Sequence, residues 1–249
     1  MAFCTLPKII RIKSLATIGQ KILAWSVHVF TATGAVAAFL AIIAIDQEDW
    51  ARCFLWLFVC LVIDGVDGTF ARLANAKETL PNVDGKHIDF VVDFVTYVII
   101  PVFFFYKAGM TSDHLMLPCA AMMLLSSSVY YGITNMTDND EYFIGFPALW
   151  NVIVFFQFFI VHTGSVSNFW IVVLFSILHF VPLRYAYPSR AKKYFWAHLI
   201  IAIIGLAAGL YILLTYPSRN QLLEWITLVG ALYFAGMAII ESLQKLSKK

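Results

Sequence analysis

Long apolar runs separated by short polar breaks account for most of this chain. Eight of the runs are long enough to cross a hydrocarbon layer about 30 Å thick as α-helices. We expect these spans at residues 25–45, 52–75, 84–106, 114–134, 143–162, 168–186, 194–215 and 222–242. The pattern predicts an all-α polytopic membrane protein with about eight transmembrane helices, in which residues 25–242 form a single transmembrane domain.

The two ends of the chain differ from these runs because they are basic. Lys8, Arg11 and Lys13 lie among isoleucines near the N-terminus. Residues 1–24 are therefore expected to form an amphipathic interfacial helix on an anionic membrane surface. Residues 243–249 form a short basic tail.

Composition and charge agree with a membrane protein. Hydrophobic residues make up 61% of the chain and charged residues only 13%, about half the charged share of a soluble domain. The net charge of +2 gives no bulk attraction to nucleic acid. If the N-terminus is cytoplasmic, Arg52, Lys107 and Arg219 are the positive residues left outside. This bias predicts that both termini are cytoplasmic.

Four aspartates lie in the second and third expected spans, where carboxylates are costly. They occur in D-G-V-D-G-T-F-A-R at residues 64–72 and G-K-H-I-D-F-V-V-D at residues 85–93. Each costs about 2.5–3.5 kcal/mol at the centre of an inserted helix, so a compensating interaction is needed. The four are Asp64, Asp67, Asp89 and Asp93. A bound cation is the simplest compensation.

Helical geometry brings these carboxylates onto two faces. At about 100° per residue, Asp64 and Asp67 share an arc with the small residues Gly68 and Ala71 and with Arg72. On the next helix, Gly85, Asp89 and Asp93 are spaced i, i+4, i+8 and form one stripe. Two helices joined by a turn can therefore face four carboxylates at one another. The glycines and the alanine leave room for a bulky ligand, so the pattern predicts a metal site with a ligand slot.

The type of cation follows from the ligand atoms. Oxygen-only ligands suit hard cations such as Mg²⁺ and Mn²⁺, which often bridge phosphate oxygens. Two ions are expected, because one divalent ion would leave excess negative charge among four carboxylates. Two such ions can together neutralise and polarise a bound phosphate group.

The pattern D-x2-D-G-x2-A-R followed by G-x3-D-x3-D resembles the signature of the CDP-alcohol phosphotransferases, integral membrane enzymes that move a substituted phosphate from a CDP-linked lipid to an alcohol. The match covers about thirty of the 249 residues. Twelve residues, Leu73 to Asp84, separate Arg72 from Gly85, where the family usually has eight. This enlarged turn resembles the branch that makes phosphatidylcholine from CDP-diacylglycerol and free choline.

The resemblance implies roles for the motif residues. Asp64, Asp67 and Asp89 would bind metal, while Asp93 would bind metal or accept the proton of the choline hydroxyl. Asp89 and Asp93 are the expected catalytic pair. Nucleotide and lipid phosphate would contact Gly68, Ala71, Arg72, Gly85, Arg184 and Arg190. A homodimer is also implied.

Several of these residues have a simpler interpretation. Arg72 can snorkel to the interface beside a close-packed helix crossing, and Arg184 and Arg190 can serve as a positive-inside anchor. Tyr97 continues the stripe of Asp89 and Asp93 and would give choline an aromatic wall, but it can equally be a core or lipid-facing tyrosine.

The expected function is transfer of the phosphatidyl group to choline at the cytoplasmic face of a bacterial inner membrane. Within the same chemistry, serine, inositol or glycerol 3-phosphate is an alternative acceptor. A cation transporter is the alternative from another class, because intramembrane aspartates often mark ion paths. Transporters tend to show repeated halves, and no internal repeat is evident in this sequence.

Overall fold

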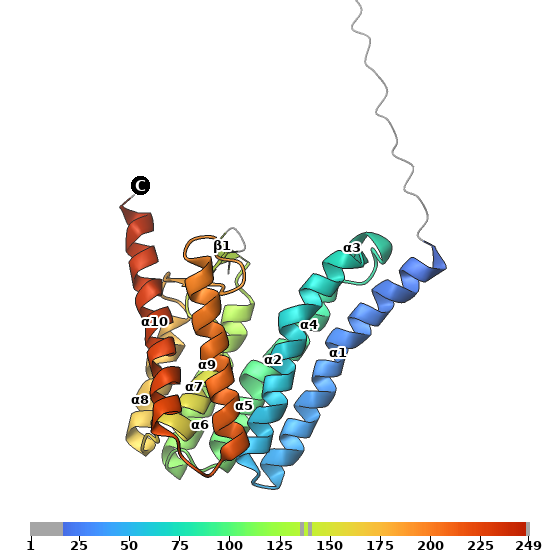
Figure 1. The fold of residues 1–249 in the computed structure, drawn as a ribbon. Helices are drawn as coiled ribbons and strands as arrows, with labels where there is room; N and C mark the ends of the chain where they lie inside the picture. The colour runs from blue at the N-terminus through green and yellow to red at the C-terminus, as the bar shows by residue number, and fades with distance from the viewer. Residues whose placement is uncertain (1–16, 135–136, 139–140, 248–249) are drawn as a thin grey trace, which may run out of the picture.

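The computed structural model describes residues 17–134, 137–138 and 141–247, and its helices run side by side (Figure 1). Five described helices are long and apolar enough to cross a membrane. They are α1 (Ile18–Asp46), α2 (Trp50–Leu73), the continuous helix Gly85–Lys107, α9 (Phe195–Thr215) and α10 (Gln221–Leu246). The all-α membrane fold is therefore confirmed.

The other helices are shorter or more polar. They are α3 (Ala76–Thr79), α6 (Asp113–Tyr131), α7 (Trp150–Phe155) with the π-helix η2 (Phe156–Ile160), and α8 (Ser165–Leu178). At 1.5 Å per residue, the 14 residues of α8 reach only about 21 Å. The five qualifying helices therefore do not confirm the expected count of eight.

Two of the expected spans were partly wrong, because the span at 143–162 begins in a short strand and the span at 168–186 ends in one. β1 (Thr137–Asp138), β2 (Tyr142–Ile144) and β3 (Arg184–Ala186) form an antiparallel sheet in that order. Phe143 pairs with Tyr185 in its register. Gly145 follows β2 at φ 80°, a conformation that a helix excludes. Apolar runs of this length do not distinguish a strand from a helix by sequence alone.

The first helix begins earlier than expected. Thr17 caps α1 through a capping box with Gln20, so residues 18–24 belong to the first membrane helix. The expected boundary at residues 24 and 25 does not coincide with an element boundary. Most of the expected amphipathic helix lies outside the described residues.

Small side chains let α1 pack closely. Its buried face includes Ala24, Gly34, Ala38 and Ala41, and it contacts α2, α3 and the continuous helix Gly85–Lys107, of which α5 is the last part (Ile100–Lys107). Close approach through small residues is the usual basis of helix packing in a membrane. Large apolar side chains such as Phe39, which is 59% exposed, point outward, as expected where hydrocarbon is the solvent.

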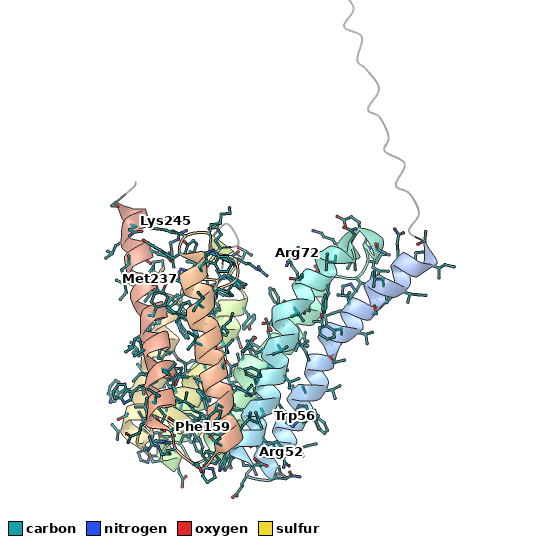
Figure 2. The ribbon with its side chains drawn as sticks, viewed as in Figure 1. Arg52, Trp56, Arg72, Phe159, Met237 and Lys245 are labelled. Carbon is teal, nitrogen blue, oxygen red and sulfur yellow. The ribbon has the colours of Figure 1, made fainter. Side chains whose placement is uncertain are left out.

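The bundle has two distinct ends. Figure 2 shows Arg72 and Lys245 at one end, and Arg52 and Phe159 at the other. Phe159 belongs to a group of aromatic rings packed edge to face, with centroids 5.2 Å apart between Phe54 and Phe159. Arg72 and Lys245 therefore lie at the opposite end of the bundle from Arg52 and Phe159.

Candidate metal centre

Three of the four motif aspartates converge between α2 and α4 (Gly85–Phe94). One carboxylate oxygen from each of Asp64, Asp89 and Asp93 lies within 4.8 Å of the other two, and the three residues are half-buried. Asp67 is outside this trio but lines the same cavity of about 10 Å³. Thr31 on α1 lines it too, within hydrogen-bonding reach of Asp67.

The α4 helix carries two of these ligands because its start is well defined. The Asp84 side chain accepts a hydrogen bond from the Lys86 N–H at 3.0 Å and caps the helix. From Gly85 the regular helix then presents Asp89 and Asp93 on one face. The preceding connection contains the short helix α3 rather than an open loop.

Two glycines allow α4 to lie against α1. A Cβ at Gly34 would be 2.7 Å from Val92 Cγ1, and a Cβ at Gly85 would be 2.9 Å from His28 Cε1. Both distances are too short for ordinary carbon contacts, which lie at about 3.5–4.0 Å. Gly85 therefore has a packing role in this structure, whereas its expected contact with nucleotide stays a prediction.

The chemistry of the donors fits a hard divalent cation. Among the described residues, no lysine or arginine forms an ion pair with the four aspartates. Ligand oxygens around one Mg²⁺ lie at most about 4.2 Å apart, and one oxygen each of Asp64, Asp89 and Asp93 lies within 4.8 Å of the others. The cavity has room for about one water-sized particle. These three residues can therefore hold a metal ion.

Tyr97 lies in the π-helix η1 (Val95–Ile99), directly after α4. Its hydroxyl donates a hydrogen bond to Asp64 Oδ2 at 2.7 Å, and the residue is 6% exposed. The expected choline contact of Tyr97 remains a prediction.

The remaining motif residues lie on the last turns of α2. Arg72 donates to Thr69 Oγ1 at 2.8 Å, and a Cβ at Gly68 would make an ordinary 3.5 Å contact with an Arg72 guanidinium nitrogen. Arg72 is exposed, Ala71 is half-buried, and Arg72 attracts Asp67 electrostatically. The arginine therefore lies beside the carboxylates without pairing to them.

Arg190 approaches the same cluster from the connection between β3 and α9. It is close enough to attract Asp64 and Asp89. Its guanidinium lies 4.8 Å from the centroid of the Tyr187 ring, and Tyr187 stacks on Phe143 at 4.0 Å between centroids. Two aromatic rings thus support Arg190.

The titration of Tyr187 reflects this location. Burial raises the pKa of its phenol above the usual range, while Arg190 lowers it and the carboxylates of Asp64, Asp93 and Asp89 raise it further. Tyr187 therefore lies near the carboxylate cluster.

Arg184 lies elsewhere, although it is only six residues before Arg190. Its guanidinium lies 4.0 Å from the centroid of the Tyr142 ring, and its backbone N–H donates to Ser242 Oγ at 2.8 Å. Tyr142 in turn donates to Glu241 Oε1 at 3.3 Å. The structure therefore joins Arg184 to α10, and its phosphate contact stays a prediction.

Sequence reasoning missed two tyrosines near the cluster. Tyr187 and Tyr131 both interact electrostatically with Asp64, Asp89 and Asp93. Neither is marked by a local motif, because the chain contains 11 tyrosines and 22 phenylalanines. Only the packing of distant segments identifies them.

The fold and the carboxylate cluster define an integral membrane protein that can hold a divalent cation between two of its helices. No protein-family model matches the chain. The chain is 38% identical to a phosphatidylcholine synthase of Mesorhizobium japonicum, over 75% of this chain and 69% of the relative. It is 36% identical to that of Agrobacterium fabrum, over 79% and 81%, and 31% identical to that of Pseudomonas aeruginosa, over 90% and 93%. The chain belongs to the phosphatidylcholine synthase family, which confirms the resemblance to the choline-using branch.

Proposed function

We propose that this protein transfers the phosphatidyl group of CDP-diacylglycerol to choline and releases CMP. The choline oxygen forms a bond to the phosphatidyl phosphorus, the bond from that phosphorus to the CMP oxygen breaks, and the hydroxyl proton leaves to a base. The convergence of Asp64, Asp89 and Asp93 beside Arg190, in a chain of this family, supports the proposal.

Each of the chain's own groups has a part in this reaction. Asp64, Asp67 and Asp89 hold the cations, and Asp93 either shares them or accepts the proton of choline. Mn²⁺ or Mg²⁺, with two ions in this proposal, supplies positive charge to the pyrophosphate when bound. Arg190 and Arg72 offer planar donors to the phosphate oxygens.

Location follows from the same proposal. The bundle end with Arg72 and Lys245 faces the cytoplasm of a bacterium, where nucleotide-activated lipid and CMP belong, and the chain crosses the inner membrane eight times with both termini inside. The distribution of positive residues supports this orientation. Residues 25–242 act as one domain, and the homodimer implied by the family resemblance remains a prediction.

Substitution of Asp89 or Asp93 tests the proposal. Asp89→Asn and Asp93→Asn remove a charge from the cluster at nearly constant volume, and we expect each to abolish CMP release from CDP-diacylglycerol plus choline. The matched control is Asp113→Asn, which alters an exposed aspartate in the first turn of α6 and should retain activity.

The assay uses purified, membrane-inserted protein with Mn²⁺ or Mg²⁺ against chelator, and with choline against serine. Near-normal turnover in both cluster variants would refute the site. CMP release with serine alone would refute the acceptor, and activity that survives complete chelation would refute the role of the metal.

A further inference from the structure

Tyr97 is a buried side chain that makes a hydrogen bond to one of the three clustered carboxylates. Its hydroxyl donates to Asp64 Oδ2 at 2.7 Å, across 33 residues of sequence. A hydrogen bond to a carboxylate at this distance belongs to the strong, charge-assisted kind. The contact links η1 to α2 at the first aspartate of the motif and restrains one oxygen of the Asp64 carboxylate.

The backbone around Tyr97 explains how the side chain reaches α2. The Ile100 N–H bonds to the Val95 carbonyl, five residues back, which is the pattern of a π-turn. Pro101 follows four residues after Tyr97. A proline ring clashes with the carbonyl four residues before it in an α-helix and provides no N–H. The wider turn accommodates Pro101, and it also changes the direction in which Tyr97 projects.

The ring of Tyr97 is poorly placed to receive choline in this structure. A quaternary ammonium binds over an accessible aromatic face. Tyr97 is only 6% exposed, and its neighbours Thr96 and Val98 are 2% and 0% exposed. Its hydroxyl already donates a hydrogen bond to Asp64. Tyr97 therefore contributes to the site through this hydrogen bond rather than through its ring face.

We propose that Tyr97 is a positioning residue, which holds the Asp64 carboxylate toward Asp89 and Asp93 so that the trio can bind a divalent cation. The inference rests on the metal site of the proposed function and extends it to a residue that does not bind the metal. Groups that orient metal ligands typically account for about 10- to 100-fold in metal affinity or activity. In this role the ring serves as a rigid support for the hydroxyl.

The test measures Mn²⁺ binding to purified protein without substrate, by electron paramagnetic resonance of the free ion. Tyr97→Phe removes the hydroxyl and keeps the ring, so we expect the Kd for Mn²⁺ to rise about 10- to 100-fold. The matched control is Tyr106→Phe, on the same membrane helix, where the tyrosine is 58% exposed. Its Kd should equal that of the wild type.

Kinetics then separate positioning from choline binding. At saturating Mn²⁺ we expect Tyr97→Phe to regain most of its turnover with an unchanged KM for choline. A raised KM for choline with an unchanged Kd for Mn²⁺ overturns the inference in favour of a choline wall. Equal Kd values for the Tyr97→Phe and Tyr106→Phe variants overturn it as well.

The same substitution in an Asp64→Asn protein distinguishes the proposed role from a general folding defect. If Tyr97 acts through Asp64, then Tyr97→Phe causes no further loss of Mn²⁺ affinity in an Asp64→Asn protein, whereas an additive loss contradicts the inference. A wild-type protein that binds no Mn²⁺ overturns this inference and the proposed metal site together. A wild type that binds Mn²⁺ while Tyr97→Phe binds it equally well overturns this inference alone.

Discussion

Gly34 on α1 is the position where one methyl group should disturb the metal centre without touching a ligand. A Cβ at this site would lie 2.7 Å from Val92 Cγ1. Carbon atoms in contact normally lie about 3.5–4.0 Å apart, so Gly34→Ala must move the two groups apart by roughly 0.8–1.3 Å. Val92 stands between Asp89 and Asp93 on α4, and its displacement therefore moves both carboxylates.

The side chain of Val92 cannot easily rotate away from this clash. Valine in a helix has one strongly preferred rotamer, so the helix itself must shift. Overpacking of this kind costs about 1–3 kcal/mol of stability, which leaves a folded protein. A misplacement of about 1 Å at a catalytic site costs on the order of 100-fold in rate. We therefore expect Gly34→Ala to lose far more activity than stability.

The assay compares CMP release per inserted molecule, at saturating Mn²⁺, with the unfolding temperature in detergent. Gly236→Ala on α10 is the matched control, because a Cβ there meets nothing within 4 Å. The double variant Gly34→Ala with Val92→Ala removes the clash and should recover much of the lost rate. Full activity of Gly34→Ala, or a double variant no better than the single one, would refute the reasoning.

Two further predictions concern other contacts. Arg190→Ala should raise the KM for CDP-diacylglycerol without weakening Mn²⁺ binding, because Arg190 is a positive charge beside the cluster and not a metal ligand. Steady-state kinetics and Mn²⁺ titration check this, and an unchanged KM or a weaker Mn²⁺ affinity would contradict it. Ser127→Ala should destabilise the protein by about 1–3 kcal/mol, because the buried Trp150 indole N–H donates to Ser127 Oγ at 2.7 Å and would lose its partner. Thermal unfolding measures this loss, with the exposed Ser26→Ala on α1 as control.

The positions of Arg184 and Arg190 could not be predicted from the sequence. Arg184 and Arg190 form one basic cluster in the sequence, and both were expected to meet phosphate. The structure sends Arg184 to Tyr142 and the α10 helix, and Arg190 to the carboxylates. The direction of each side chain depends on how β3 pairs with β2, and residues 143–144 and 184–186 were expected to be helical. Short apolar strands carry no periodicity that separates them from the ends of a membrane helix.

The sequence alone determined the membrane class and the carboxylate stripes, and five of its eight expected spans match the five long apolar helices, because hydrophobic length and helical spacing are local properties of the chain. It also indicated the family, through residues close together in two segments. Only the tertiary structure decided that Asp64 meets Asp89 and Asp93 while Asp67 turns toward Thr31, that a π-turn brings Tyr97 to Asp64, and that Tyr187 supports Arg190. Those outcomes depend on the angle and depth at which separate segments pack, and small residues such as Gly34 and Gly85 set that packing from a distance in sequence.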